Sequence, residues 1–242
     1  EPEDTRVRSR LAIRPNPACG EGNNAALVLD GEKITLHQVA INGTVLDKCH
    51  YMLTDNALSI PGVPQEPFTL EIENTCNPQA NTALSGLYMS NGIYCTQCEA
   101  EGFRRITYFY DRPDVMARFT VRMEASREAF PVLLSNGNPK AAGEAGNGRH
   151  FALWEDPFPK PSYLFALVAG NLASISDHFV TKSGRRVKLG IYVEHGKEAR
   201  CLYAMEALKN SMRWDEKTFG REYDLDIFMI VAVGDFNMGA ME

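Results

Sequence analysis

The chain has 242 residues, of which 44% are hydrophobic and 23% are charged. At ~150 residues per domain this length corresponds to roughly 1.6 domains, and the composition excludes a disordered, fibrous or membrane-spanning chain. The net charge of −6 argues against nucleic acid as a partner, because nucleic-acid binding needs a basic face. The longest uncharged apolar runs, 164–169 and 227–233, are too short to cross a bilayer, so we expect no membrane partner either.

The chain starts at Glu1 without a methionine and ends at Glu242 without a terminating signal, which suggests a piece cut from a longer protein. Residues 1–10 are charged rather than apolar and are not typical of a signal peptide. The six cysteines are too sparse for a disulfide scaffold, so we expect reduced thiols and a cytoplasmic location. Cys95 and Cys98 form a C-x-x-C pair without a second pair, which is only a weak indication of zinc or redox chemistry.

The first two-thirds of the chain predicts antiparallel strands, because short stretches alternate apolar with polar residues and are bounded by turn residues. The stretches with this pattern are 7–13, 33–41, 44–46, 68–73 and 117–125. Asn42-Gly43 is expected to turn a hairpin rather than serve as a glycosylation site. A second hairpin is expected where 132–134 meets Asn136-Gly137, and 136–148 is expected to be a surface loop. Short strands of this kind favour sheet packed on sheet over alternating strands and helices.

The pattern changes after residue 170. A hairpin is expected over 179–193, followed by a helix over 198–219 whose apolar stripe contains Leu202, Met205, Leu208 and Met212. Gly220 stands where a helix C-terminus favours a left-handed residue. The continuously apolar run 227–233 predicts a buried strand. We therefore expect a domain boundary near Asn171.

Two segments place acidic residues beside small ones. They are Thr96–Tyr108, with the sequence TQCEAEGFRRITY, and Phe236–Glu242, with the sequence FNMGAME. Judged on composition alone, the plain interpretation of both is a surface loop with solvated acids.

Gly239-Ala240-Met241-Glu242 resembles the first four residues of the G-A-M-E-N motif of zinc aminopeptidases of the aminopeptidase N type. The TQCEAEGFRRITY segment, followed by Asp111-Arg112-Pro113-Asp114, resembles the bacterial and apicomplexan branch of that family. Further matches, in family order, are 163–170, 214–216 and 222–225. The chain contains no H-E-x-x-H, and none of its five histidines stands four residues from another. The family's first β strand is also missing, so the chain resembles a family member trimmed at both ends.

The resemblance implies a mainly β fold. Residues 1–171 would form an antiparallel, sandwich-like or saddle-like N-terminal β domain, and residues 172–242 would form the first α+β part of a thermolysin-like catalytic domain. It also implies a metallopeptidase, a zinc hydrolase that removes single residues from peptide N-termini. The partners would be peptides with a free N-terminus and the missing catalytic and C-terminal domains of the same chain. Zinc and the catalytic residues would belong to the parent, so no metal, cofactor or activity is expected in residues 1–242 themselves.

The resemblance also assigns substrate-binding residues. Glu99 and Glu242 match the family's two acids that bind the α-amine, which is largely a cation near neutral pH. Carboxylates suit this task, because charge-assisted hydrogen bonds are about twice as strong as neutral ones. The remaining matches are Gln97 and Met238, which line the pocket for the first side chain, and Gly239 and Ala240, whose backbone lines the substrate. Cys98 is interpreted as a packing residue rather than a nucleophile.

Two other functions remain open from the sequence. One is a non-catalytic interaction scaffold of the same architecture with a degraded metal site. The other is a free-standing β-sandwich binding module formed by residues 1–171. An H-E-x-x-H in the encoded sequence after Glu242 would favour the enzyme over the scaffold.

Overall fold

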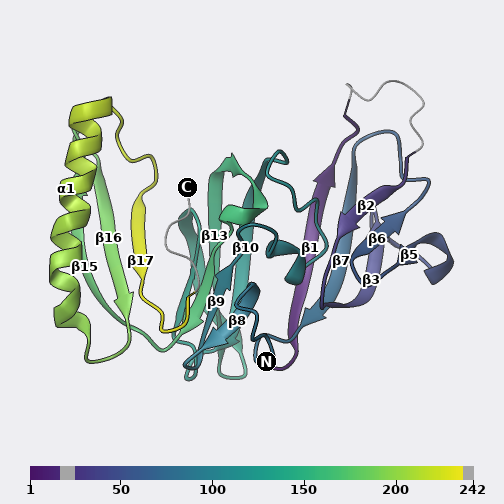
Figure 1. Cartoon of the computed structure of the whole chain (residues 1–242), viewed down its shortest axis with the longest axis horizontal. Coiled ribbons are helices and arrows are strands. Elements are labelled where there is room, and N and C mark those ends of the chain that lie inside the picture. Colours follow the sequence, from purple (N-terminus) through teal and green to yellow (C-terminus); the bar gives the residue numbers. More distant parts are fainter. Residues whose placement is uncertain (17–24, 237–242) are drawn as a thin grey trace.

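The computed structural model describes residues 1–16 and 25–236. Groups of strands follow one another along the long axis of the molecule, and the single described α-helix, α1 (Leu202–Phe219), lies at one end (Figure 1). Most of the regular structure is β, as the sequence predicts, and nearly all strand pairs are antiparallel. Within the described residues, no helix is both long enough and apolar enough to cross a membrane.

Two small sheets pack at the end of the molecule that carries the N-terminal strands. The first has the order β1 (Thr5–Ile13), β7 (Phe68–Cys76), β3 (Thr35–Ile41), β4 (Thr44–Val45), and the second has the order β2 (Leu27–Asp30), β6 (Ala57–Ile60), β5 (Met52–Leu53). Their facing sides bury a common set of side chains that includes Leu29, Leu58 and Leu70. The predicted hairpin is confirmed, because Asn42 and Gly43 have φ of 49° and 79° between β3 and β4. These dihedrals match the twist that a two-residue hairpin needs.

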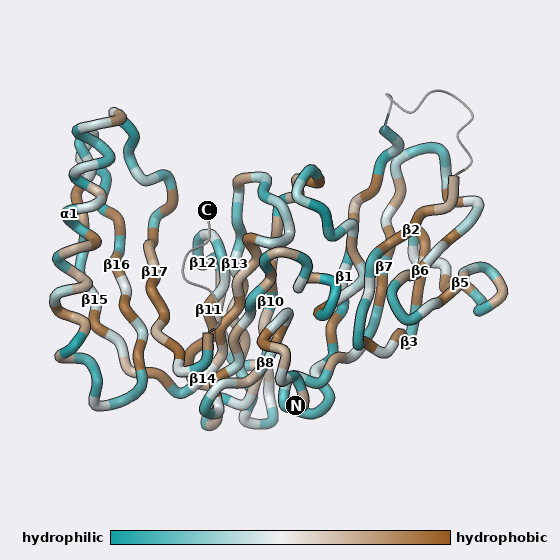
Figure 2. The backbone as a smooth tube through the Cα atoms, in the orientation of Figure 1, coloured by the Kyte–Doolittle hydropathy of each residue, from teal (hydrophilic) through white to brown (hydrophobic). Residues whose placement is uncertain are grey.

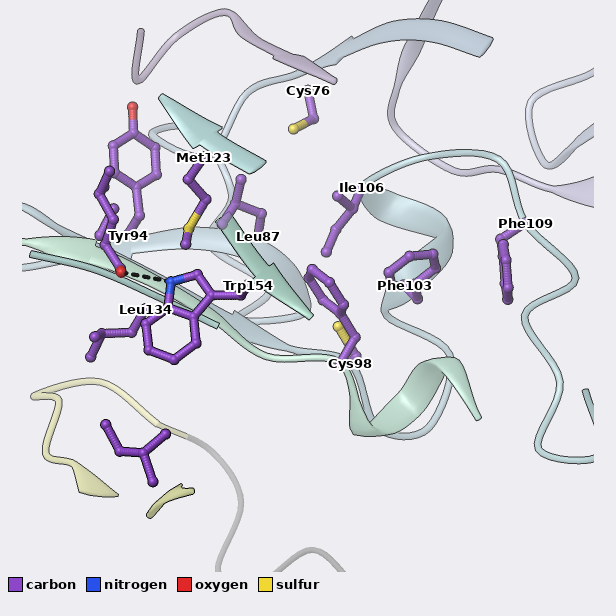
Figure 3. Close-up of a cluster of buried hydrophobic side chains, with 14 residues drawn as sticks. Cys76, Leu87, Tyr94, Cys98, Phe103, Ile106, Phe109, Met123, Leu134 and Trp154 are labelled. Carbon is purple, nitrogen blue, oxygen red and sulfur yellow. Dashed lines mark hydrogen bonds between the residues drawn. The ribbon is translucent and has the colours of Figure 1, made fainter. Parts of the chain in front are cut away.

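Two further sheets form the middle of the molecule. One has the order β11 (Val132–Ser135), β14 (Leu167–Gly170), β9 (Ile93–Gln97), β8 (Gly86–Ser90), and the other has the order β10 (Ala117–Ser126), β13 (Arg149–Lys160), β12 (Asn138–Gly146). The core between them contains the Trp154 indole, which donates a hydrogen bond to the carbonyl of Leu133 at 3.1 Å (Figure 3). Short 3-10 helices lie outside these sheets, namely η2 (Lys48–His50), η3 (Phe103–Arg105), η4 (Ser162–Leu164) and η5 (Glu198–Cys201).

Two expectations for 132–148 are wrong. Asn136-Gly137 does not turn a hairpin, because β11 pairs with β14 while β12 pairs with β13 in a different sheet. The Asn136 side chain instead bridges the main chain of another segment, accepting from the N–H of Ala166 at 2.6 Å and donating to the carbonyl of Leu164 at 3.1 Å. The expected loop is mostly strand β12, whose residues are largely exposed and show no apolar alternation. The hairpin turn comes later, at Asn147 and Gly148, which have φ of 51° and 70°.

The last sheet has the order β15 (Ala173–Val180), β16 (Arg186–Val193), β17 (Ile227–Val231), and α1 covers one of its faces (Figure 1). β15 and β16 form the predicted hairpin, whereas β16 and β17 are parallel, with α1 as the crossover between them. Gly220 ends the helix with a φ of 66°, as predicted. The predicted apolar stripe of the helix is wrong at Leu202, which is 61% exposed. Cys201 of η5 takes its place against the sheet.

β17 lies between two hydrophobic cores. Phe228 and Ile230 pack on the α1 side, and the alternate residues Ile227, Met229 and Val231 pack against the core of the middle sheets. Side chains of a strand alternate between faces, so a strand apolar on both faces has a continuously apolar sequence. Figure 2 shows this strand as a hydrophobic stretch of the backbone. The predicted strand is confirmed, although it ends at Val231 and four of its five residues are only half-buried.

The burial of α1 yields a matched stability test. Leu208 is 8% exposed and Leu202 is 61% exposed on the same helix. Replacing Leu208 with Ala should lower the free energy of unfolding by about 2–4 kcal/mol, because it removes buried methyl groups and leaves a cavity. Replacing Leu202 with Ala should change it by less than about 0.5 kcal/mol. Urea unfolding followed by circular dichroism measures both, and equal losses would contradict this packing of the helix.

Candidate functional site

Gln97 and Glu99 lie at the end of β9 and in the turn that follows it. Gln97 is the last residue of β9, opposite Gly86 of β8, and is 3% exposed. Its Nε2 donates to the main-chain carbonyl of Glu99 at 3.3 Å, so the structure brings these two predicted residues together. Glu99 is half-buried, and its Oε2 is fully shielded yet has no hydrogen-bond partner among the described residues. An unpaired buried carboxylate oxygen is costly, which makes it a candidate for binding a cationic donor.

The turn that carries Glu99 closes by main-chain contact. The N–H of Gly102 donates to the carbonyl of Cys98 at 2.8 Å. A Cβ atom at Gly102 would lie 2.4 Å from the carbonyl oxygen of Gln97 and 2.8 Å from the nitrogen of Gly86. Because the φ of Gly102 is an ordinary −82°, the lack of space for a Cβ, and not the dihedral, makes glycine necessary here.

Cys98 points away from this site into the core. It is 1% exposed and belongs to the same cluster as Phe103 and Ile106 (Figure 3). Burial, with a smaller contribution from the charge of Asp111, raises the pKa of its thiol far above the ordinary range. Since the thiolate is the reactive form, Cys98 is a packing residue rather than a nucleophile, as predicted.

Behind the turn lies a polar cluster that no pattern in the sequence indicates. Arg104 of η3 forms an ion pair with the buried carboxylate of Asp111, with Nε 3.0 Å from Oδ2. Burial opposes the guanidinium charge, but the hydrogen bond to Asp111 and the nearby charges of Asp30, Asp111 and Glu101 together raise the pKa of Arg104. The arginine therefore remains charged. In the sequence, Asp111 belongs to a stretch that resembles the family, but no local pattern indicates that its side chain is buried.

The chain that leaves β17 is fixed to the hairpin that carries Gln97. The Tyr88 hydroxyl donates to the Asp235 carbonyl at 2.9 Å, and the Ser90 hydroxyl donates to Asp235 Oδ2 at 2.8 Å. Ser90 Oγ also accepts from the Asp235 N–H at 3.0 Å. Both tyrosine and serine belong to β8, the neighbour of β9. The four other predicted site residues, Met238, Gly239, Ala240 and Glu242, lie outside the described residues.

The side chains of residues 1–16 and 25–236 do not fit a zinc ion. No three His, Cys, Asp or Glu side chains in these ranges converge as metal ligands would. His150 instead contacts the carbonyl of Phe130 at 2.8 Å, and His37 contacts the Thr75 hydroxyl at 3.0 Å. A zinc site needs three or four such ligands at bonding distance, and the side chains of these two ranges do not supply them.

Gly102→Ala tests the tight turn. The added Cβ would meet two main-chain atoms that cannot rotate away, so the free energy of unfolding should fall by about 1–3 kcal/mol. Gly143→Ala is the control, because its Cβ would meet only the edge of the Phe151 ring, at 3.1 Å. Chemical denaturation of both variants makes the comparison. A Gly102→Ala protein as stable as the control would show that the turn has room for a side chain.

The thiols should differ in reactivity. Burial raises the pKa of Cys76 to about 11 and raises that of Cys98 further, whereas Cys49 is exposed. Iodoacetamide at pH 8, read out per residue by mass spectrometry, should therefore label Cys49 and leave Cys76 and Cys98 unmodified until urea unfolds the protein. Rapid labelling of Cys98 in the folded protein would contradict its placement in the core.

Comparison with known proteins agrees with this fold. The family described as Peptidase M1 N-terminal domain matches residues 10–164. The Aminopeptidase N of Caulobacter vibrioides is 55% identical over 241 residues, which are 100% of this chain and 27% of that protein. The solved structure of Legionella pneumophila aminopeptidase A in complex with aspartic acid is 41% identical, with a TM-score of 0.88, over 93% of this chain and 26% of that one.

A more distant structure shares the fold. The M1 zinc metallopeptidase of Deinococcus radiodurans, solved with a Tyr-ser-ala substrate, has a TM-score of 0.78 at 18% identity and covers 98% of this chain and 54% of that one. The chain thus spans about a quarter of the length of the Caulobacter and Legionella proteins. The family match covers more than half of the chain, and the chain therefore belongs to the M1 peptidase family.

Proposed function

We propose that this chain is part of a zinc aminopeptidase of the aminopeptidase N type and that it supplies an anchor for the α-amine of the peptide substrate. The observation that carries the proposal is the buried Oε2 of Glu99, which has no hydrogen-bond partner within residues 1–16 and 25–236. A carboxylate shielded from water is stabilised by a donor that brings positive charge. An α-ammonium group is such a donor, and the resulting hydrogen bond is among the strong ones.

An amine anchor explains why such an enzyme would remove one residue at a time. When the amine is fixed, the first peptide bond lies at a set distance from the anchor, so only that bond reaches the catalytic centre. Holding reacting groups in place in this way can supply several kcal/mol of the barrier reduction. A rigid support is therefore as important as the carboxylate itself. The main-chain contacts around Gly102 support Glu99 in that manner.

The other assigned residues are proposed to complete the binding site. Glu242 would share the amine with Glu99, and Gln97 and Met238 would line the S1 pocket for the first side chain. Gly239 and Ala240 would present their backbone to the substrate. Supporting this, Asp235 is bound to β8 next to the strand that carries Gln97. Glu242 is seven residues further along the chain, which can span up to ~3.5 Å per residue.

We also propose a domain boundary near residue 171, with an N-terminal β domain over 1–171 and the beginning of a catalytic domain over 172–242. The family match ends at residue 164, and β15 begins at Ala173. The sheet that β15 opens has its own hydrophobic core against α1. β17 joins the two parts, since one of its faces packs on the middle sheets.

The zinc of the proposed enzyme would be held by residues beyond those described, because the side chains of 1–16 and 25–236 do not fit it. The metal would activate the water that attacks the peptide bond. This chain by itself would then be inactive. The five described cysteines are free thiols, which supports a cytoplasmic location. The main alternative, a non-catalytic scaffold, gives no reason for a shielded carboxylate oxygen that lacks a partner among the residues the structure describes.

Glu99→Ala tests the proposed anchor in the full-length aminopeptidase. It should lower kcat/KM for an aminoacyl p-nitroanilide by about 100-fold or more, because the loss of one charge-assisted hydrogen bond in a desolvated site is of the order of 3 kcal/mol. Glu101→Ala is the matched control, two residues along the same turn. The Glu101 side chain is 67% exposed and lies 3.4 Å from Arg104, and an exposed pair of that kind contributes little. An unchanged kcat/KM in Glu99→Ala would refute the assignment.

A further inference from the structure

We infer that Asp111 is a positioning residue for the amine anchor: its buried carboxylate holds the turn that carries Glu99 in place. The inference rests on the proposed function of Glu99. Asp111 itself lies in the loop after η3, and its side chain is 1% exposed. A carboxylate so deeply buried must be satisfied by several donors, and its donors identify what it holds.

Three donors converge on the Asp111 carboxylate. Oδ2 accepts from the main-chain N–H of Arg104 at 3.1 Å and from the Nε of Arg104 at 3.0 Å. Oδ1 accepts from the Ser162 hydroxyl at 2.6 Å. The guanidinium also donates from Nη2 to the main-chain carbonyl of Asp111 at 3.1 Å. Main chain and side chain of Arg104 are thus both fixed by one acid.

The same cluster joins segments that are far apart in the sequence. Ser162 belongs to η4, 51 residues after Asp111. The N–H of Asp111 donates to Asp30 Oδ2 at 3.1 Å, and the carbonyl of Arg104 accepts from the N–H of Glu32 at 2.9 Å. η3 is therefore fastened to β2, to the loop after it and to η4. These contacts connect the turn to the N-terminal sheets, through β2, and to the segment between β13 and β14 of the middle sheets, through η4.

The contacts that hold η3 also restrain Glu99, because the two lie only a few residues apart in the chain. The turn begins at Gln97, which β8 holds by strand pairing, and it ends in η3. The N–H of Arg105 donates to the carbonyl of Gly102 at 3.0 Å, and Gly102 lies so close to Gln97 and Gly86 that it has no space for a Cβ atom. Without Asp111, Arg104 would be a partly buried cation lacking its closest counter-ion, and η3 would have to move to hydrate it. Glu99 would then lose one of the two supports of its turn.

The first test uses the 242-residue chain and hydrogen–deuterium exchange. Asp111→Ala should speed exchange of the amides of Gly102 and Arg105 by about tenfold or more, because their local opening becomes easier. Exchange in β15 and β16 should stay unchanged. Asp114→Ala, which removes an exposed carboxylate three residues away, is the control and should change neither region. Unaltered protection of 98–105 in Asp111→Ala would overturn the inference.

The second test separates positioning from a general structural defect. In the full-length aminopeptidase, two inhibitors measure the preference for a free amine: an aminoacyl hydroxamate and its desamino analogue. The preference is the ratio of the inhibition constant of the desamino analogue to that of the aminoacyl hydroxamate. Asp111→Ala should reduce this ratio by about tenfold, and it should cause no further reduction in a Glu99→Ala background. A smaller fraction of folded enzyme would lower activity but leave the ratio unchanged.

The outcomes distinguish the inference from the function on which it rests. A ratio that falls in Glu99→Ala but not in Asp111→Ala overturns the role of Asp111 alone. A ratio that does not fall in Glu99→Ala overturns the proposed function. If Asp111→Ala does not fold, Asp111→Asn and Ser162→Ala replace it, because each removes only part of the network. Both should then reduce the ratio by a smaller factor, and no reduction in either would refute the inference.

Discussion

The contact between the main chains of Gly86, Gln97 and Gly102 is the constraint on which the site depends. Strand pairing fixes the first two residues, and the third approaches so closely that a Cβ atom would overlap them. The chain is thereby folded back on itself directly after β9. Glu99 lies inside this turn, so the position of its main chain follows from the turn, and its Oε2 has no hydrogen-bond partner among the described residues.

Two sets of contacts connect this turn to the rest of the molecule. On one side, Cys98 and Phe103 insert into the core of the middle sheets, where the Phe103 ring packs edge-on against Phe165 at 5.0 Å. On the other side, β17 adds apolar side chains to that same core while its opposite face packs under α1. The chain then returns to β8 through Asp235. Two hydrophobic cores with one shared strand thus hold Asp235 and Gln97 near one hairpin.

The sequence predicted those parts of the fold that local patterns determine. Alternation along 117–125, the apolar run of β17 and the glycine that ends α1 each have one local physical cause, and each is present. Strand β12 was missed because its small and charged residues lie largely exposed at a sheet edge, where no hydrophobic alternation is required. Asn136 was misassigned because its side chain bonds to a segment about thirty residues away.

The candidate site shows the same division between local and long-range causes. Gln97 and Glu99 came from resemblance to a family motif, because an acid in a loop has no local feature that distinguishes binding from solvation. Asp111 and Ser162 could not be predicted as a pair, since their hydrogen bond joins two segments that lie 51 residues apart in the chain. Burial of a polar side chain is a property of the assembled fold, and here it distinguishes the supporting acid from the exposed ones around it.

The most direct measurement of the central claim is a crystal structure of the proposed full-length aminopeptidase with an amino acid bound as product. The account predicts that Oε2 of Glu99 lies about 2.7–2.9 Å from the α-amine nitrogen, the distance of a charge-assisted hydrogen bond. An α-amine bound elsewhere, with Oε2 of Glu99 paired instead to another protein group, would contradict it.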